Sequence, residues 1–211
     1  MAAPDTSTAN GRREQRRQRH QDLSRGQILD AAEEVFGRKG FHATTLKEIV
    51  ELAEFSVGSV YSFFDSKDDL FQQIFLRRGE EYMPRVNAVL SGRGTALELL
   101  HDLVEFEIGW FREHPHFGRL WLRHSHTAPE PDAAIGVNYA ETMQLQADLF
   151  ARGQAEGVFA AGDPGVLARL LSGLVAAFQQ LDPLVMSDDP EAVPPMTLNE
   201  FHALIQRTFT S

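Results

Sequence analysis

The chain has 211 residues, of which 43% are hydrophobic and 24% are charged, and this composition is typical of a globular protein. It contains no cysteine, which excludes a disulfide framework, a cysteine zinc site and a thiol nucleophile. No apolar run approaches the roughly 20 residues of a membrane helix, and no apolar stretch follows the N-terminal arginines. We therefore expect a cytoplasmic protein with no membrane partner and no secretory signal.

The net charge of −10 is unevenly distributed along the chain. Residues 1–78 carry 12 basic and 12 acidic side chains, whereas residues 79–211 carry 8 basic and 18 acidic ones. All three lysines lie in the first part, and so does a run with five arginines. This asymmetry predicts two functional parts, of which the first can approach a polyanion.

The N-terminal segment, residues 1–23, is predicted to be a disordered basic arm. Small, polar and helix-breaking residues dominate its beginning, and the arginine run follows. Two interpretations of this arm remain open. Arg16, Arg17 and Arg19 either contact a nucleic-acid backbone or a narrow minor groove, or they belong to a solvated tail that aids solubility.

Residues 24–82 are predicted to form an N-terminal three-helix domain that ends in a fourth, longer helix. Ser24 can cap the first helix, in which apolar residues recur at spacings of one, three and four. Thr45 and Glu48 have the spacing of a capping box, and they begin a short second helix.

The third helix is also short, and the fourth is long. Ser56 can cap the third helix, and Val60 and Phe64, four residues apart, can form its buried face. The fourth helix begins after another serine and is expected to end near Tyr82, because Pro84 disfavours its continuation.

The C-terminal region, residues 85–211, is predicted to consist of further helices. They cover residues 95–113, 115–123, 132–157, a segment that starts at Asp163-Pro164, and residues 197–208. The stretch from 182 to 195 contains four prolines and is predicted to be a loop. No segment alternates with a period of two, so the predicted fold class is all-α, with about nine helices.

Residues 45–64 have the pattern of a helix-turn-helix. Two short helices are joined by a few residues, and Ala53 supplies a small side chain where they cross. The second helix leaves short side chains on its free face, so a DNA backbone can approach closely. Serine hydroxyls and the Tyr61 phenol suit phosphate oxygens, whereas Val57 suits a thymine methyl group. An ordinary helical hairpin that binds no DNA has the same spacing.

The segment from about Ile28 to Phe75 resembles the tetracycline-repressor family of bacterial transcription regulators. The resemblance rests on ILDAAEEVFGRKGFHATT (28–45), on Glu48-Ile49 and on SVGSVYSFFDSK (56–67). The last of these contains the pattern G-[ST]-[LIV]-Y-x-x-F followed by Ser-Lys, which is specific at this spacing. The family fold that it implies has a helix-turn-helix domain and a C-terminal helical domain.

The resemblance implies that Thr45, Tyr61 and Lys67 bind DNA phosphates. Two positions depart from the family pattern: Val57 stands where a basic residue is common, and Glu54 stands where a turn glycine is common. The DNA-binding candidates of the domain are Thr44, Thr45, Lys47, Ser56, Val57, Gly58, Ser59, Tyr61, Ser62 and Lys67, with Arg16, Arg17 and Arg19 of the arm.

The resemblance also implies a homodimer that binds a palindromic double-stranded DNA operator and responds to a small-molecule effector, most simply as a repressor. No enzymatic activity and no cofactor are expected. Aromatic bulk early in the C-terminal region can be plain core or can line an effector cavity. The cavity candidates are Phe106, Trp110, Trp121, Tyr139 and Met143.

A patch of small residues in the penultimate predicted helix allows close helix packing. Gly173, Ala176 and Ala177, together with Phe201 and Ile205 of the last helix, are candidates for a four-helix dimer interface. The same residues can instead pack within one chain, and the sequence does not decide between these alternatives.

Five of the eight histidines lie between His101 and His126. A cluster of His114, His116, His124, His126 and Glu113 provides the alternative hypothesis, a helical metal-binding protein or enzyme. However, residues two apart on a helix do not share a face, and neither cysteine nor an HExxH motif is present. No metal is therefore predicted.

Overall fold

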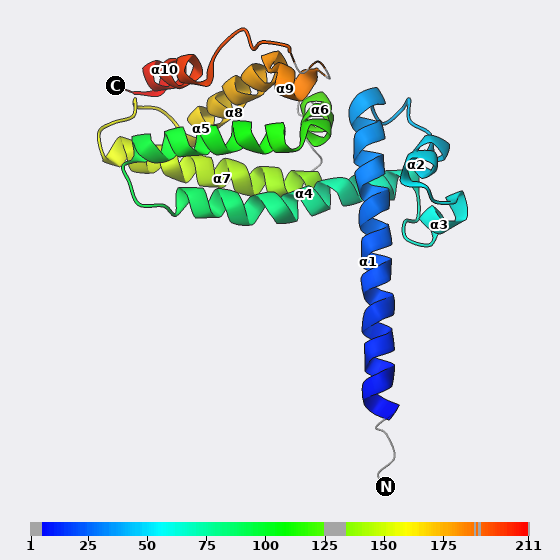
Figure 1. Cartoon of the computed structure of the whole chain (residues 1–211). Helices are drawn as coiled ribbons and strands as arrows, with labels where there is room; N and C mark the ends of the chain where they lie inside the picture. Colours follow the sequence, from blue (N-terminus) through cyan, green and yellow to red (C-terminus); the bar gives the residue numbers. More distant parts are fainter. Residues whose placement is uncertain (1–5, 125–133, 188, 190, 211) are drawn as a thin grey trace. The chain divides into compact units, whose positions relative to one another are not determined.

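The structure is a computed structural model that describes residues 6–124, 134–187, 189 and 191–210. Over these residues it consists of ten helices and one isolated bridge between Phe159 and Thr210 (Figure 1). The all-α prediction is confirmed. The chain divides into two compact units, Met1–Ile74 and Phe75–Ser211, so the division falls inside helix α4 (Lys67–Leu90).

Helix α1 (Thr6–Lys39) of the first unit is much longer than predicted. The prediction of a disordered arm over residues 1–23 is wrong from Thr6 onward, and residues 1–5 lie outside the described part. Arginine, glutamine and glutamate are good helix formers, and no proline interrupts the arginine run. A helix that is nucleated by packing farther along can therefore extend back through it. Ser24, predicted as the N-cap, lies inside this helix.

The core of the first unit joins α1 to α2 (Leu46–Ala53), α3 (Val57–Tyr61) and the start of α4. Its largest fully buried side chains are Phe36, Phe64, Ile28, Leu29, Ile49, Leu70 and Ile74. The stripe predicted for the first helix supplies three of them, as expected for an amphipathic helix. The predicted capping box of Thr45 and Glu48 is present at the start of α2.

Helix α4 continues through Pro84 to Leu90, beyond its predicted end near Tyr82. A proline inside a helix removes one backbone hydrogen bond and destabilises it by roughly 3 kcal/mol. Val86, which follows the proline, is fully buried in the core of the second unit. The burial of apolar side chains beyond Pro84 therefore offsets its cost, and sequence pattern alone does not show this.

The second unit contains the rest of α4 and six further helices. They are α5 (Ala96–Glu113), α6 (Pro115–His124), α7 (Ala134–Ala155), α8 (Pro164–Leu181), α9 (Pro183–Met186) and α10 (Leu198–Phe209). Helices α5, α7 and α8 pack against one another, and α10 packs against α5 and α8. No helix in the described segments is long and apolar enough to cross a membrane.

Helix α9 lies in the segment that was predicted to be a loop. Asp182 caps it by accepting a hydrogen bond from the Leu184 N–H at 3.1 Å, and the buried Arg119 donates to the Val185 carbonyl at 2.7 Å. Arg112 forms an ion pair with Asp182 at 2.7 Å. The two arginine contacts join residues 66 and 70 positions apart, so local sequence could not reveal this single turn.

Candidate functional site

Helix α3 presents a free face of short side chains around one large ring. Val60 is buried, whereas 42% of Val57 and 55% of Tyr61 are exposed. Ser56 caps the helix, and its Oγ accepts a hydrogen bond from the Ser59 N–H at 3.1 Å. The predicted division into a buried and a free face is confirmed.

The serine hydroxyls of this helix already have partners within it. Ser56 Oγ lies 2.8 Å from Ser59 Oγ, and Ser62 Oγ donates to the Ser59 carbonyl at 2.6 Å. Ser56 and Ser62 are exposed, so their oxygens stay accessible. A phosphate that accepts a hydrogen bond from Ser62 must displace the bond to Ser59.

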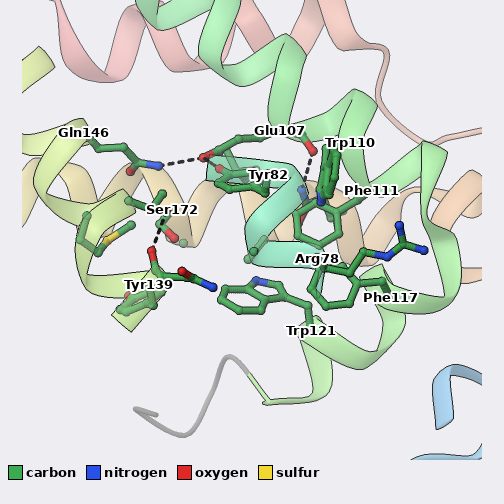
Figure 2. Close-up of a pocket in the computed structure, with 18 of the residues that line it drawn as sticks. Arg78, Tyr82, Glu107, Trp110, Phe111, Phe117, Trp121, Tyr139, Gln146 and Ser172 are labelled. Atoms are coloured by element: carbon green, nitrogen blue, oxygen red, sulfur yellow. Dashed lines mark hydrogen bonds between the residues drawn. The ribbon is translucent and has the colours of Figure 1, made fainter. Parts of the chain in front are cut away.

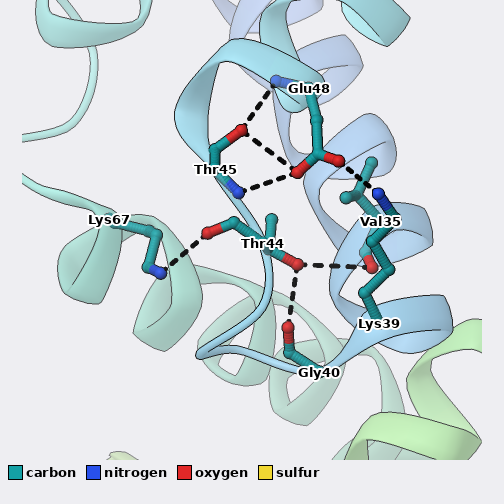
Figure 3. Close-up of polar contacts among 7 residues, drawn as sticks. All are labelled: Val35, Lys39, Gly40, Thr44, Thr45, Glu48 and Lys67. Carbon is teal, nitrogen blue, oxygen red and sulfur yellow. Dashed lines mark hydrogen bonds and ion pairs between the residues drawn. The ribbon is translucent and has the colours of Figure 1, made fainter.

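The loop before α2 contains one buried and one exposed threonine. Thr44 is 2% exposed, and its hydroxyl donates to the Gly40 carbonyl at 2.8 Å, with the Val35 carbonyl at 3.5 Å (Figure 3). Its assignment as a DNA-binding side chain is therefore wrong, because a buried hydroxyl bound to main-chain carbonyls cannot reach a phosphate. Thr45 is exposed and caps α2.

Glu48 closes the capping box and joins α2 to α1. Its carboxylate accepts a hydrogen bond from the Thr45 N–H at 2.9 Å and forms an ion pair with Lys39. The bonds from Lys39 and Thr45 hold the pKa of Glu48 at about 2. Thr45 is thus held in place on the surface of the unit (Figure 3).

Lys67 braces the same loop from the start of α4. Its Nζ donates to the carbonyl oxygens of Phe41 and Thr44, both at 2.8 Å, and lies 4.3 Å from the centre of the Phe41 ring. An ammonium group has three donors, so one N–H is left for a phosphate. The structure therefore gives Lys67 a role in holding the helix-turn-helix loop, which the sequence did not reveal.

Glu54 forms the turn between α2 and α3 in the left-handed conformation, with φ 59° and ψ 34°. Among the described residues it is the only one besides glycine with positive φ. Its backbone N–H donates to the Val50 carbonyl, which ends α2. The turn therefore keeps the shape that a glycine would adopt freely, at the cost of some strain.

The basic candidates outside the helix-turn-helix are exposed. Arg12, Arg13, Arg16, Arg17 and Arg19 recur on α1 at spacings of three and four, so they share one side of this helix. Lys47 projects from α2 with 80% of its side chain exposed, and Glu51 lies 3.7 Å away. A pair this exposed contributes little to stability, so Lys47 remains available to an anion.

The second unit contains a cavity of about 340 Å³ between its helices (Figure 2). Four of the five predicted cavity residues line it, namely Trp110, Trp121, Tyr139 and Met143. Phe106 does not, because α5 turns Glu107, Trp110 and Phe111 toward the cavity. Its ring lies instead 5.3 Å from that of Tyr82 and below the guanidinium of Arg85.

A polar cluster that sequence analysis missed lies within this apolar cavity. Glu107 is 6% exposed, and its Oε1 accepts hydrogen bonds from the Tyr82 hydroxyl at 3.2 Å and from Gln146 Nε2 at 2.8 Å (Figure 2). Burial raises the pKa of Glu107 to about 7, although both hydrogen bonds favour the charged form. The same burial and the carboxyl raise the pKa of Tyr82 well above its usual range.

The sequence did contain a signal for Glu107. It lies four residues after Leu103 and four before Phe111, both buried, so it occupies the apolar stripe of α5. An acidic residue within such a stripe is unusual and indicates either a buried partner or a site.

The comparisons with known proteins agree with the helix-turn-helix. A family model described as bacterial regulatory proteins of the tetR family matches residues 28–74. The transcriptional regulator YfiR of Bacillus subtilis is 47% identical over 55 residues, which are 26% of this chain and 27% of YfiR. The transcriptional activator FasR of Mycolicibacterium smegmatis is 31% identical over 133 residues, 62% of this chain and 60% of FasR.

The likeness to solved structures extends over both units. A TetR/AcrR-family regulator from Thermobifida fusca is 25% identical with a TM-score of 0.60, over 87% of this chain and 94% of that one. The helix-turn-helix segment of this chain, residues 28–74, belongs to the tetR family. A putative regulator from Saccharomonospora viridis, solved in complex with choline, has the same fold, with a TM-score of 0.71 at 22% identity over 90% of this chain and 99% of that one.

The match to the curated relatives is partial. It spans about a quarter of the length of YfiR and about three fifths of FasR. The names of these relatives are those of transcription regulators and not of enzymes. The helix-turn-helix therefore carries the likeness to the tetR family, and the second unit shares the fold of solved tetR-family regulators.

The predicted dimer candidates fall into two groups. Phe201 and Ile205 are buried in the core of their own chain, where the Phe201 ring stacks 4.4 Å from Phe178, so their assignment to an interface is wrong. Gly173 and Ala177 are exposed on α8, and Ala176 is half-buried. All three also line the cavity.

The histidines do not converge on a site in the part of the chain that the structure describes, where no three His, Asp or Glu side chains could hold a metal ion. His114 packs against Trp110, with ring centres 4.3 Å apart, and His124 Nδ1 lies 2.8 Å from the Leu120 carbonyl. His126 lies outside the described residues.

Proposed function

We propose that this protein is a ligand-responsive transcription regulator that binds a palindromic operator as a homodimer, most simply as a repressor. The observation that carries the proposal is the exposed face of α3. Val57 and Tyr61 project from a helix whose other face is buried, and Thr45 is fixed at the start of α2 by the capping box. Short side chains let a recognition helix approach the bases in the major groove.

The proposed division of labour between the units follows from the charges and the cavity. The arginines along one side of α1 can add contacts to phosphates, whereas the excess of acidic residues beyond position 78 disfavours DNA there. The cavity of the second unit has the size and the mostly apolar lining of a small-molecule site.

The proposed dimer is supported by an exposed apolar stripe on α8. Val166, Leu170 and Leu181 are 47%, 53% and 58% exposed, and their spacing places them on one side of the helix with Gly173 and Ala177. An apolar face of this kind on a soluble protein marks an interaction surface. A two-fold axis through it would join two copies of α8 in an isologous interface.

Helix α4 provides a proposed route from effector to operator. Its first residue, Lys67, holds the helix-turn-helix loop, and Phe75, Arg78, Gly79 and Tyr82 of the same helix line the cavity. An effector that binds one position of α4 more tightly shifts the population toward it. The spacing of two recognition helices then no longer matches two half-sites one helical turn apart.

The test measures binding of the purified protein to DNA from upstream of its own gene, over a series of salt concentrations with unrelated DNA as competitor. We expect a specific complex of two chains per site whose affinity falls steeply with salt. Binding that the competitor removes, or a complex with one chain per site, would contradict the proposal.

A further inference from the structure

The polar cluster of the cavity contains two acceptor atoms without a donor, and one of them is a buried atom. Gln146 is 1% exposed, and its Oε1 is buried without a hydrogen-bond partner. The Oε1 of Glu107 accepts two hydrogen bonds, but its Oε2 accepts none from any described residue. A buried acceptor without a donor is unfavourable. The cluster is therefore incomplete by itself and lacks a donor.

The orientation of the Gln146 amide follows from its neighbour. If the amide were reversed, its oxygen would face Glu107 Oε1, and two acceptors would meet 2.8 Å apart. The carboxylate therefore holds the Gln146 amide nitrogen toward itself, and the amide oxygen remains the group that needs a donor.

No cation in the described part of the chain forms an ion pair with Glu107. Two arginines line the cavity, Arg78 and Arg169. Arg78 forms an ion pair with Glu81 at 2.7 Å, and Arg169 lies on the exposed face of α8. The other ionisable groups in the lining are Tyr82 and Tyr139. Neither arginine is paired with Glu107, so an anionic ligand in contact with Glu107 would meet an unpaired like charge.

The walls next to the cluster are aromatic. The rings of Phe117 and Trp121 are centred 6.4 Å apart, those of Trp121 and Tyr139 6.3 Å, and Trp110 lies near Tyr82 at 5.7 Å (Figure 2). The faces of aromatic rings carry negative potential and attract cations, most strongly in tryptophan. These walls suit the apolar body of a ligand and also a positive charge beside it.

We propose that the cavity binds an organic cation, a protonated amine attached to an apolar or aromatic body. Its ammonium group donates to Glu107 Oε2 and Gln146 Oε1, and its body lies among the rings of Trp110, Trp121 and Tyr139. The inference rests on the proposed function, since it names the chemical class of the effector. It assigns Glu107 and Gln146 as the residues that select this class.

The test uses three probes with the same body: phenylpropylammonium, phenylpropanol and phenylpropanoate. The chain has two tryptophans, and both line the cavity, so their fluorescence reports its occupancy directly. With the full-length protein at pH 8, we expect the ammonium to bind at least about tenfold more tightly than the alcohol, and the carboxylate most weakly. Equal or tighter binding of the alcohol or the carboxylate, or no binding of the ammonium, would overturn the proposal.

A matched pair of variants locates the selectivity. Glu107→Gln keeps the shape of the side chain and removes its charge, so the preference for the ammonium over the alcohol should disappear. Glu105→Gln makes the same charge change at an exposed position of the same helix and should preserve that preference. Equal selectivity in both variants would refute the role of Glu107. If Glu107→Gln does not fold, the three-probe series on the wild type still tests whether the cavity prefers the ammonium.

The outcome separates this inference from the function on which it rests. Binding to the upstream DNA is measured on the same wild-type preparation without probe. Specific DNA binding without selectivity for the ammonium would refute the ligand class and leave the regulator intact. Selectivity for the ammonium without specific DNA binding would support the cation site and contradict the regulator.

Discussion

The helix-turn-helix loop of the first unit and the cavity of the second use their polar groups differently. In the first, the Thr44 hydroxyl and the Lys67 ammonium are bound to backbone carbonyls from Val35 to Thr44. In the second, Gln146 donates to Glu107, and the Oε1 of Gln146 stays buried without a donor. The first arrangement fixes the shape of a surface, whereas the second leaves a site that another molecule can complete. A recognition surface needs the former, and a sensor needs the latter.

The largest change in the free energy of unfolding is expected when Lys67, which holds the helix-turn-helix loop, is replaced. Lys67→Met keeps the aliphatic stem on Phe41 but removes two hydrogen bonds from a charged donor, so the first unit should lose about 3 kcal/mol of stability. Lys47→Met is the control, because its exposed pair with Glu51 contributes little. Urea unfolding of both variants measures the difference.

The same variants distinguish a brace from a phosphate contact. If Lys67 only holds the loop, log DNA affinity plotted against log salt concentration should have the same slope in Lys67→Met as in the wild type. If it also binds a phosphate, the slope of log affinity against log salt concentration falls by about 0.9 for each chain, or about 1.8 for the proposed dimer. Equal stability of Lys67→Met and Lys47→Met would show that the loop is not held by Lys67, and the contrast between the units would then be lost.

The next effect concerns Glu107 and has the opposite sign. Its pKa is raised to about 7, so the folded state holds a proton that the unfolded state releases above the ordinary value of 4.5. The wild type therefore loses stability as pH rises from about 4.5 to 7. A shift of this size corresponds to roughly 3 kcal/mol at pH 8, and the weaker hydrogen bonds of a neutral amide offset part of it. Glu107→Gln, which cannot ionise, should therefore be more stable than the wild type by about 2 kcal/mol at pH 8, with little difference at pH 4.

Thermal or urea unfolding at the two pH values checks this, with Glu105→Gln as the control for a general charge effect. A variant that is less stable than the wild type at pH 8 would mean that the carboxylate is a structural brace like Lys67. The polar groups of the cavity would then stabilise the fold, as those of the helix-turn-helix loop do.

The sequence predicted much of the first unit because its signals are local. The capping box spans Thr45 to Glu48, and the buried Val60 and Phe64 are four residues apart, so both signals are local. The roles of Thr44 and Lys67 were missed because their partners lie up to 26 residues away. The short motif identifies the domain, but the contacts that hold it are tertiary.

The second unit was less predictable for the same reason. Apolar residues at helical spacing look alike whether they fill a core, line a cavity or meet another chain, so Phe201 and Ile205 were assigned to an interface although they are core. The cavity prediction succeeded for Trp110 and Trp121 because aromatic bulk concentrates there. The informative residue was instead the acid in the stripe, Glu107.

The smallest change in stability is expected at Glu54. It tests whether the turn between α2 and α3 is held as rigidly as the loop that Lys67 contacts. Glu54 has φ 59°, a conformation that costs a residue with a side chain roughly 1–2 kcal/mol more than glycine. Glycine is also more flexible in the unfolded chain, which cancels part of the gain. Glu54→Gly should therefore raise the free energy of unfolding by about 0.5 to 1 kcal/mol.

The control for this change is Glu54→Ala, which removes the same charge but keeps the strain. Urea unfolding should therefore place Glu54→Ala at or below the wild type and Glu54→Gly above it. Both variants lack a negative charge near the proposed DNA surface, so both should bind DNA more tightly. A shared increase in DNA affinity with a difference in stability separates electrostatics from strain. Equal stability of the two would mean that the turn relaxes to accommodate a side chain and is a flexible joint between α2 and α3.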